Sequence, residues 1–411
     1  YSLESLNNKD RFGIRLSVFP EIRIPAKQGE LDDHAATPST ELPGILQVMD
    51  LQQEQLARSL GEGHRVIHGV AGSGKTLILG YRAKYLAQAC TKPILILCYN
   101  SVLAKRLQYW IQQKGIADKV NVHTFHAWCH RQLTAYNIGL PNLDAEEEGY
   151  WDDLVNRIIG AVDNKLIPAS QYEAVLIDEG HDFHPEWLKL VVQMVDPRTN
   201  SLLVLYDDVQ SIYHTAEKRN FSFKSVGIQA QGRTTILKLN YRNTHEILEF
   251  AGRFAHHLLT PNETDEDSAP RLLPISAGRH GPKPLLIKLP SLMEEARYIV
   301  EQFKIAHKAG TPWKDMAILY RNWHPVGKTV RNALVTAGIP FSWKNNIQFN
   351  AQQDTVKLLT FHSSKGLEFP LVAIPDANMQ AEEEKQDEEA CLLYVAMTRA
   401  TQELMVLERA G

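Results

Sequence analysis

The chain has 411 residues, which is enough for two or three domains. Hydrophobic residues make up 44% and charged residues 22%, a globular balance that excludes a largely disordered chain. The net charge of −4 provides no overall basic field, so nucleic-acid binding would need a local groove. The apolar runs are strand-sized and too short to span a bilayer, so we expect no membrane partner.

The four cysteines contain no CxxC pair, which excludes a disulfide scaffold and a four-thiolate zinc site. This usage fits a reducing cytosol, and we expect a cytoplasmic location. The chain begins with Tyr1 and no signal segment follows it. Residues 1–46 contain four prolines and are expected to be a linker or the remnant of an upstream domain.

A helix is predicted over residues 50–60, with Asp50 as its N-cap and Gly61 as its end. Short apolar runs then alternate with helical stretches. Most of the runs carry Val, Ile and Leu on both faces, which is typical of parallel strands covered by helices. The first series comprises residues 65–68, 94–98, 174–177, 202–205 and 236–239. The second comprises residues 285–289, 316–320, 356–359, 371–374 and 404–407, with helices predicted over 293–308 and 328–337.

These two series predict an α/β fold with two lobes. The boundary is expected between residues 213 and 236, where 218–232 is polar and contains glycine. We therefore predict a first domain over 47–232, with a small insert at about 127–172, and a second domain over 233–411.

The strongest motif is GVAGSGKT at residues 69–76, which fits the P-loop pattern at every fixed position. Its glycines would let backbone N–H groups turn toward a phosphate, and the following helix would add partial positive charge. Lys75 would reach the β and γ oxygens, and the Thr76 hydroxyl would ligate Mg²⁺. The predicted nucleotide-binding residues of this loop are Gly69, Gly72, Ser73, Gly74, Lys75 and Thr76.

Carboxylates follow two of the predicted strands. Asp178 and Glu179 come directly after the run 174–177, where open α/β sheets place ligand groups. Asp178 would hold Mg²⁺, and Glu179 would orient or deprotonate the attacking water. Asp207, Asp208 and Gln210 come after the next strand. Gln210 would hydrogen-bond the terminal phosphate or the water; a simple turn is the alternative for this segment.

The order of further strings is more specific than the P-loop. They are CYNSVLAKRL at 98–107, TFH at 124–126, IDEGHD at 177–182, DDVQSIY at 207–213, NYRN at 240–243, TFHSSKGLEF at 360–369 and LLYVAMTRA at 392–400. From about Asp50 to the last residue, this series resembles the motif set of UvrD/Rep-type superfamily 1 DNA helicases. The resemblance implies two RecA-like P-loop NTPase domains that use ATP and Mg²⁺.

The resemblance also implies roles for single residues around ATP. Gln55 would read the adenine edge and Tyr241 would stack on the adenine ring. Arg242 and Arg399 would reach the γ-phosphate from the second lobe, and Glu368 would contact the ribose. Two such arginines would stabilise charge on the phosphoryl group only when the lobes close, which couples hydrolysis to motion. The catalytic set is then Lys75, Asp178, Glu179, Gln210, Arg242 and Arg399.

On the nucleic-acid side, the resemblance implies the residues Tyr99, Asn100, Thr124, Phe125, His126 and His362. Aromatic rings there would stack on bases. For Tyr99 and Phe125, packing in the core is the competing interpretation. Family members carry Trp-Arg-Gly-Ala after QSIY, where this chain has His214-Thr215-Ala216-Glu217. The stacking aromatic is therefore absent, or replaced by Tyr213 or His214.

The inserts after TFH and after NYRN are short, so both accessory domains of the large helicases are expected to be reduced or absent. Strings such as VMDLQQEQLARSL also resemble helicase lobes that follow a nuclease-related (NERD) domain. The prediction is an ATP-dependent DNA helicase or translocase, with 3′→5′ polarity implied by the resemblance alone. Its partner would be single-stranded DNA or a tailed duplex, with RNA left open and an upstream nuclease domain as a further candidate. The alternatives are an ATP-gated single-strand-binding module, the motor subunit of a nuclease that does not itself unwind, and a P-loop kinase.

Overall fold

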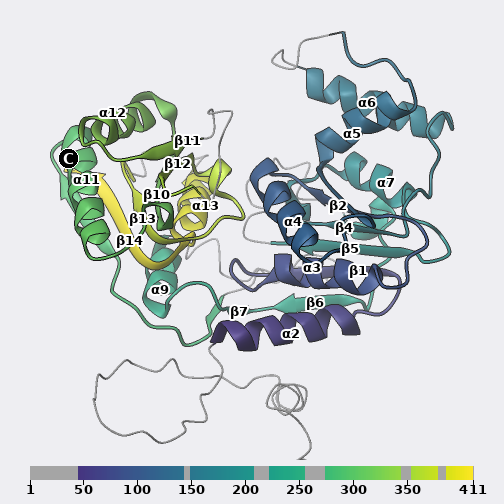
Figure 1. The fold of residues 1–411 in the computed structure, drawn as a ribbon, viewed down its shortest axis with the longest axis horizontal. Helices are drawn as coiled ribbons and strands as arrows, with labels where there is room; N and C mark the ends of the chain where they lie inside the picture. Colours follow the sequence, from purple (N-terminus) through teal and green to yellow (C-terminus); the bar gives the residue numbers. More distant parts are fainter. Residues whose placement is uncertain are drawn as a thin grey trace, which may run out of the picture. The chain divides into compact units, whose positions relative to one another are not determined.

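This computed structural model describes residues 45–142, 149–207, 222–254, 274–343, 353–377 and 386–410. The described chain divides into two compact units, and the division along the chain falls between Lys238 and Leu239. The ribbon in Figure 1 follows the chain from purple to yellow. Each unit is built around one parallel sheet.

The first unit holds a six-stranded parallel sheet in the order β3-β2-β4-β5-β1-β6. Non-consecutive neighbours require crossover connections, and helices supply them. The strands are β1 (His64–Gly69), β2 (Ile94–Cys98), β3 (Val120–Thr124), β4 (Ala174–Ile177), β5 (Ser201–Tyr206) and β6 (Thr234–Leu237).

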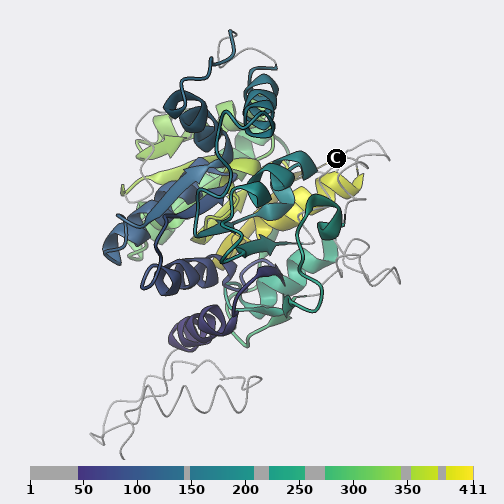
Figure 2. The same cartoon turned by 90° about the vertical axis from the view of Figure 1, so that its right-hand side faces the viewer.

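Helices cover both faces of this sheet, because alternate strand residues point to opposite sides. On β5, Leu202 and Val204 pack with the helices α5 to α7, whereas Leu203 and Leu205 pack with α2 to α4. The helices are α2 (Ile45–Ser59), α3 (Lys75–Leu86), α4 (Ser101–Gln113), α5 (Phe125–Ala135), α6 (Tyr150–Asp163) and α7 (Pro185–Gln193). The purple helix α2 can be followed in both Figure 1 and Figure 2.

The second unit holds another six-stranded parallel sheet, in the order β11-β12-β10-β13-β14-β9. Its strands are β9 (Leu285–Leu289), β10 (Met316–Tyr320), β11 (Phe341–Trp343), β12 (Val356–Thr360), β13 (Phe369–Ile374) and β14 (Ala400–Arg409). A separate parallel pair joins β7 (Leu239–Asn240) to β8 (Ile275–Ser276). The helices are α9 (His245–Phe254), α11 (Leu292–Lys308), α12 (Lys328–Thr336) and α13 (Gln386–Met397).

The predicted α/β class is confirmed, and most predicted runs coincide with strands. Asp50 is not an N-cap, because α2 begins at Ile45 and Asp50 lies inside the helix. The run 236–239 is divided between β6 and β7, and β6 pairs with β1 in the first unit. The prediction missed β3 and β11, since VNVHT has a half-exposed pattern and FSW is only three residues long.

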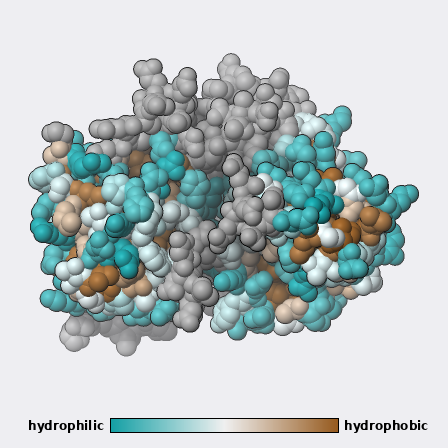
Figure 3. Space-filling model, turned by 90° about the horizontal axis from the view of Figure 1, so that it is seen from above, coloured by the Kyte–Doolittle hydropathy of each residue, from teal (hydrophilic) through white to brown (hydrophobic). Residues whose placement is uncertain are grey.

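Hydrophilic residues predominate on the face seen in Figure 3, with small hydrophobic patches. Within the described ranges, no helix is long and apolar enough to cross a membrane. The four cysteines are free thiols.

Candidate nucleotide and nucleic-acid sites

The P-loop connects β1 to α3 at the carboxyl edge of the first sheet. Gly72 and Gly74 have positive φ angles of 75° and 84°, which glycine adopts without steric cost. The first residue of α3 is Lys75, and no described side chain caps this helix. Its terminal N–H groups are therefore available to an anion such as a phosphate.

The Lys75 ammonium lies inside this loop. It donates to the carbonyl oxygens of Gly69 and Val70, and its Nζ is 3.2 Å from Asp207 Oδ2. A Cβ on Gly69 would lie 2.7 Å from Ser73 Oγ and 3.1 Å from Lys75 Cδ, so only glycine leaves room for this arrangement. Ser73 Oγ is buried and has no hydrogen-bond partner among the described residues. The loop thus holds one cation and one hydroxyl that suit a phosphate oxygen.

Asp178 follows β4 and is fully buried. Its Oδ2 accepts a 3.0 Å hydrogen bond from Thr76 Oγ1, so the P-loop and the end of β4 are in direct contact. Burial and the adjacent Glu179 carboxylate raise the pKa of Asp178 to about 7. Hydroxyl and carboxylate oxygens are hard ligands of the kind that Mg²⁺ prefers, so Thr76 and Asp178 fit this ion by ligand type.

Glu179 has a left-handed backbone, with φ of 53°, that turns the chain sharply after β4. Its Oε2 is buried and accepts no hydrogen bond from the described residues. Gly180 follows, where a Cβ would lie 2.5 Å from Val204 Cγ1, so this turn packs tightly on β5. A buried carboxylate oxygen that remains without a donor is costly unless a ligand or water satisfies it.

Near the P-loop, the sequence reasoning missed Gln53 and the role of Asp207. Gln53 is buried and its Nε2 donates to Ser73 O at 2.8 Å, whereas Gln55 is half-exposed. The helical phase could have found Gln53, because it shares a face with the buried Ala57 and Leu60. Asp207 was seen as a carboxylate after a strand, but its contact with Lys75 depends on the neighbouring positions of β5 and β1.

In the second unit, the predicted arginine motifs lie together. Asn243 Nδ2 donates to Thr398 O at 2.9 Å and to Ala400 O at 2.6 Å, the two carbonyls that flank Arg399. Arg399 O in turn accepts from Phe369 N at 3.0 Å. The buried side-chain amide of Asn243, the residue after Arg242, therefore holds the backbone on both sides of Arg399.

Arg242 and Glu368 are in direct contact, with a distance of 2.8 Å between NH2 and Oε1. The Nε of Arg242 is buried without a hydrogen-bond partner among the described residues. The Tyr241 side chain is only 7% exposed, so little of its ring is available in this structure. Arg279 donates to the carbonyls of Tyr241 and Arg242 and holds this segment.

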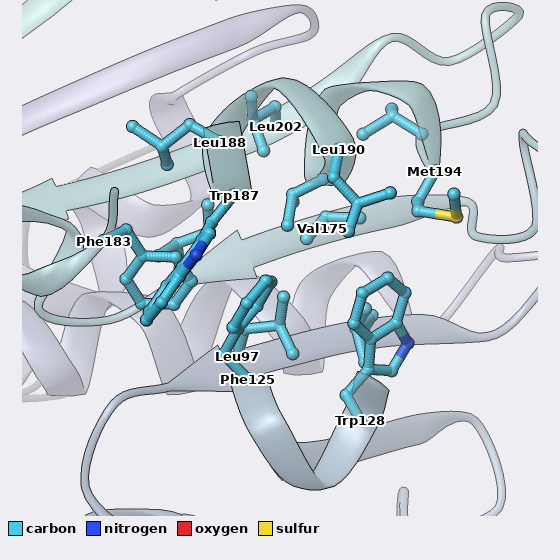
Figure 4. Close-up of a cluster of buried hydrophobic side chains, with 14 of the residues drawn as sticks. Leu97, Phe125, Trp128, Val175, Phe183, Trp187, Leu188, Leu190, Met194 and Leu202 are labelled. Carbon is cyan, nitrogen blue, oxygen red and sulfur yellow. The ribbon is translucent and has the colours of Figure 1, made fainter. Parts of the chain in front are cut away.

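On the predicted nucleic-acid side, Phe125 differs from the expectation based on the family. Its ring is fully buried and stacks on Trp187, with a centroid distance of 4.4 Å and an interplanar angle of 13° (Figure 4). Core packing, the alternative interpretation, therefore describes Phe125, and its ring cannot reach a base in this structure. Tyr99 is 46% exposed, which excludes core packing for that residue.

The other predicted residues of this side have mixed environments. Thr124 caps α5 by accepting from Ala127 N, and Asn100 is half-buried just before α4. The His126 ring packs edge-on against Trp151 and Trp187, and burial lowers the pKa of His126. His362 is exposed after β12. The predicted residues Gln210 and Tyr213 lie outside the described residues.

Sequence comparisons assign both units. The UvrD/REP helicase N-terminal domain matches residues 49–166, and the UvrD-like helicase C-terminal domain matches residues 235–353 and 343–409. Together these stretches cover more than half of the chain.

Curated relatives point to the same family. A Saccharomyces cerevisiae protein named ATP-dependent DNA helicase HMI1, mitochondrial, is 25% identical over 48% of this chain and 29% of its own length. DNA helicase II of Haemophilus influenzae is 22% identical over 88% of this chain and 62% of its own length. A probable DNA helicase of Mycoplasma pneumoniae is 24% identical over 87% of this chain and 82% of its own length. The chain thus spans well under two thirds of the yeast protein and somewhat less than two thirds of the Haemophilus protein. From both domain matches and the paired motif clusters, the chain belongs to the UvrD/Rep helicase family.

Proposed function

We propose that the chain is an ATP-dependent DNA helicase or translocase that couples ATP hydrolysis to movement along single-stranded DNA. The observation that carries this proposal is that each unit contains one compact cluster of the predicted motif residues. Lys75, Thr76 and Asp178 meet in the first unit, and Arg242 and Glu368 meet in the second beside the backbone of Arg399. The relatives that match this chain are named DNA helicases, which supports DNA as the substrate.

In the first unit, Lys75 would move from the carbonyls of Gly69 and Val70 onto the β and γ oxygens of ATP. Thr76 and Asp178 would hold Mg²⁺, which when bound neutralises charge on the phosphates. Glu179 would orient or deprotonate the attacking water, because its carboxylate has an oxygen without a hydrogen-bond donor among the described residues. Gln53 would keep the loop in shape through Ser73 O.

In the second unit, Arg242 and Arg399 would stabilise the charge that develops on the transferred phosphoryl group. Arg242 now pairs with Glu368, so the ribose role proposed for Glu368 requires this ion pair to rearrange when the nucleotide binds. Tyr241 would stack on adenine only after such a rearrangement, because its side chain is buried. Closure of the two units around ATP, followed by opening, would advance the strand.

The nucleic-acid side would include Tyr99, Asn100, Thr124, His126 and His362, without Phe125. We propose 3′→5′ movement from the family resemblance. We propose a cytoplasmic location from the cysteine usage, which fits a reducing compartment. A tailed duplex as substrate and an upstream nuclease-related domain also remain proposals.

The second candidate is an ATP-gated single-strand-binding module or nuclease motor that does not itself unwind. The size of the inserts favours it: between β3 and β4 the described residues form only α5 and α6, and β11 and β12 are separated by 12 residues. The resemblance implies that the accessory domains of the large helicases supply contacts to the duplex.

The test is DNA-stimulated ATPase activity measured beside displacement of a strand from a tailed duplex, for the parent chain and Lys75→Ala. We expect Lys75→Ala to abolish hydrolysis while Lys84→Ala, on the same helix, retains it. Hydrolysis by Lys75→Ala at the parental rate would refute the site. Strong DNA-stimulated ATPase activity without displacement or translocation would favour the second candidate.

A further inference from the structure

Two tryptophans lie at the carboxyl ends of neighbouring strands in the second unit. Trp343 is the last residue of β11, and Trp323 begins the short turn η6 (Trp323–Gly327) that follows β10. Their ring centroids are 4.5 Å apart and both rings are partly exposed. Because β11, β12 and β10 are adjacent and parallel (Figure 1), their carboxyl ends share one edge of the sheet. The exposed His362 follows β12 at this same edge.

The position of Trp323 is fixed by a glycine. A Cβ on Gly327 would lie 2.6 Å from Trp323 Cε3 and 2.8 Å from Tyr320 Cε2, so the indole packs directly on the backbone of the turn. One side of the aromatic pair also packs against the core of the unit. A ring held in this way loses little conformational entropy when a ligand stacks on it.

The surrounding chain is basic, although the protein as a whole is acidic. Residues 316–343 contain Arg321, Lys328 and Arg331 but no Asp or Glu. The guanidinium of Arg331 lies 5.1 Å from the centroid of the Trp343 ring. Within the described ranges, no carboxylate pairs with Arg331, whereas Arg321 is neutralised by Glu389. Lys328 is exposed at the first residue of α12, where the helix dipole adds positive charge.

Aromatic faces beside unpaired cations fit a polymer that alternates planar bases with phosphates. Single strands offer free base faces, whereas the bases of a duplex are stacked on one another. We propose that Trp323 and Trp343 form a base-stacking platform for single-stranded nucleic acid, with Lys328 and Arg331 contacting the flanking phosphates. This inference rests on the proposed function. Family members carry a stacking aromatic in the string Trp-Arg-Gly-Ala, which this chain lacks. The two tryptophans would supply base stacking from the second unit instead.

The test measures binding of a fluorescein-labelled oligothymidylate to the full chain by anisotropy at several salt concentrations. Trp323→Leu and Trp343→Leu keep apolar volume but lose the aromatic face, and we expect each to weaken binding about tenfold. Trp323→Phe and Trp343→Phe should retain most of the affinity. The matched control is Trp313→Leu, because Trp313 stacks on His307 before β10, at the opposite edge of the sheet, and should leave binding unchanged.

An abasic oligonucleotide of equal length separates stacking from charge. The leucine variants should bind it as the parent chain does, whereas Arg331→Gln should bind both oligonucleotides more weakly and lower the salt slope by about one. Parental affinity for oligothymidylate in folded Trp323→Leu and Trp343→Leu would overturn the inference, as would equal weakening by Trp313→Leu.

If a leucine variant does not fold, judged by circular dichroism, Arg331→Gln decides the question. Unchanged binding and salt slope in that variant would then overturn the inference. Failure of the proposed function has a different signature: the parent chain itself would show no single-strand binding and no stimulated hydrolysis.

Discussion

Asn243 offers a sharp test of how the second unit holds its arginine motifs. The side chain is fully buried, and Asn243→Ala would leave Thr398 O, Ala400 O and the Asn240 amide without their present partner. At roughly 1 kcal/mol for each lost buried hydrogen bond, the free energy of unfolding should fall by about 3 kcal/mol. Because the two carbonyls flank Arg399, its guanidinium should also lose its fixed position.

Thermal unfolding and DNA-stimulated ATPase activity would be measured together, with Asn332→Ala as a control because Asn332 is exposed on α12. The melting temperature should fall by about 2–4 °C for each kcal/mol. An arginine that stabilises phosphoryl transfer contributes about 10³-fold or more, so partial displacement should lower kcat at least tenfold. A variant that is destabilised as expected but keeps parental kcat at a temperature where it is folded would refute the proposed link between Asn243 and Arg399.

Three further predictions follow from single contacts. Thr76→Ala removes the hydroxyl that donates to Asp178, so we expect hydrolysis to require at least tenfold more Mg²⁺; an unchanged Mg²⁺ titration would exclude Thr76 as a ligand. Phe125→Leu should lower the free energy of unfolding by about 1 kcal/mol without changing the affinity for single strands. Tyr99→Leu should weaken single-strand binding without lowering stability. The reverse pattern would show that Phe125 contacts a base. Burial raises the pKa of Glu295, so its folded form binds a proton more readily than the unfolded chain and stability should fall as pH rises above about 4.5. Glu295→Gln should therefore be more stable than the parent at neutral pH and less pH-dependent in urea unfolding, and identical pH profiles would contradict this sign.

Short-range patterns in the sequence were sufficient for the architecture. Continuous Val, Ile and Leu runs such as 94–98 and 316–320 predicted strands that are buried on both faces, and both runs are strands with these limits. The P-loop string predicted a glycine-rich turn followed by a helix, because both depend on local sterics. The short segments β3 and β11 were missed, since their place in a sheet is decided by neighbours distant in sequence.

The sequence by itself determined the fold class, the P-loop and the membership of the motif strings in one family, because these depend on residue type and spacing. Only the tertiary structure decided which side chains meet. It placed Gln53 against the loop, buried Phe125 on Trp187, and joined Asn243 to the backbone on both sides of Arg399. These contacts join residues as far apart in sequence as Asn243 and Ala400, which are 157 positions apart, and no local sequence pattern specifies such a contact.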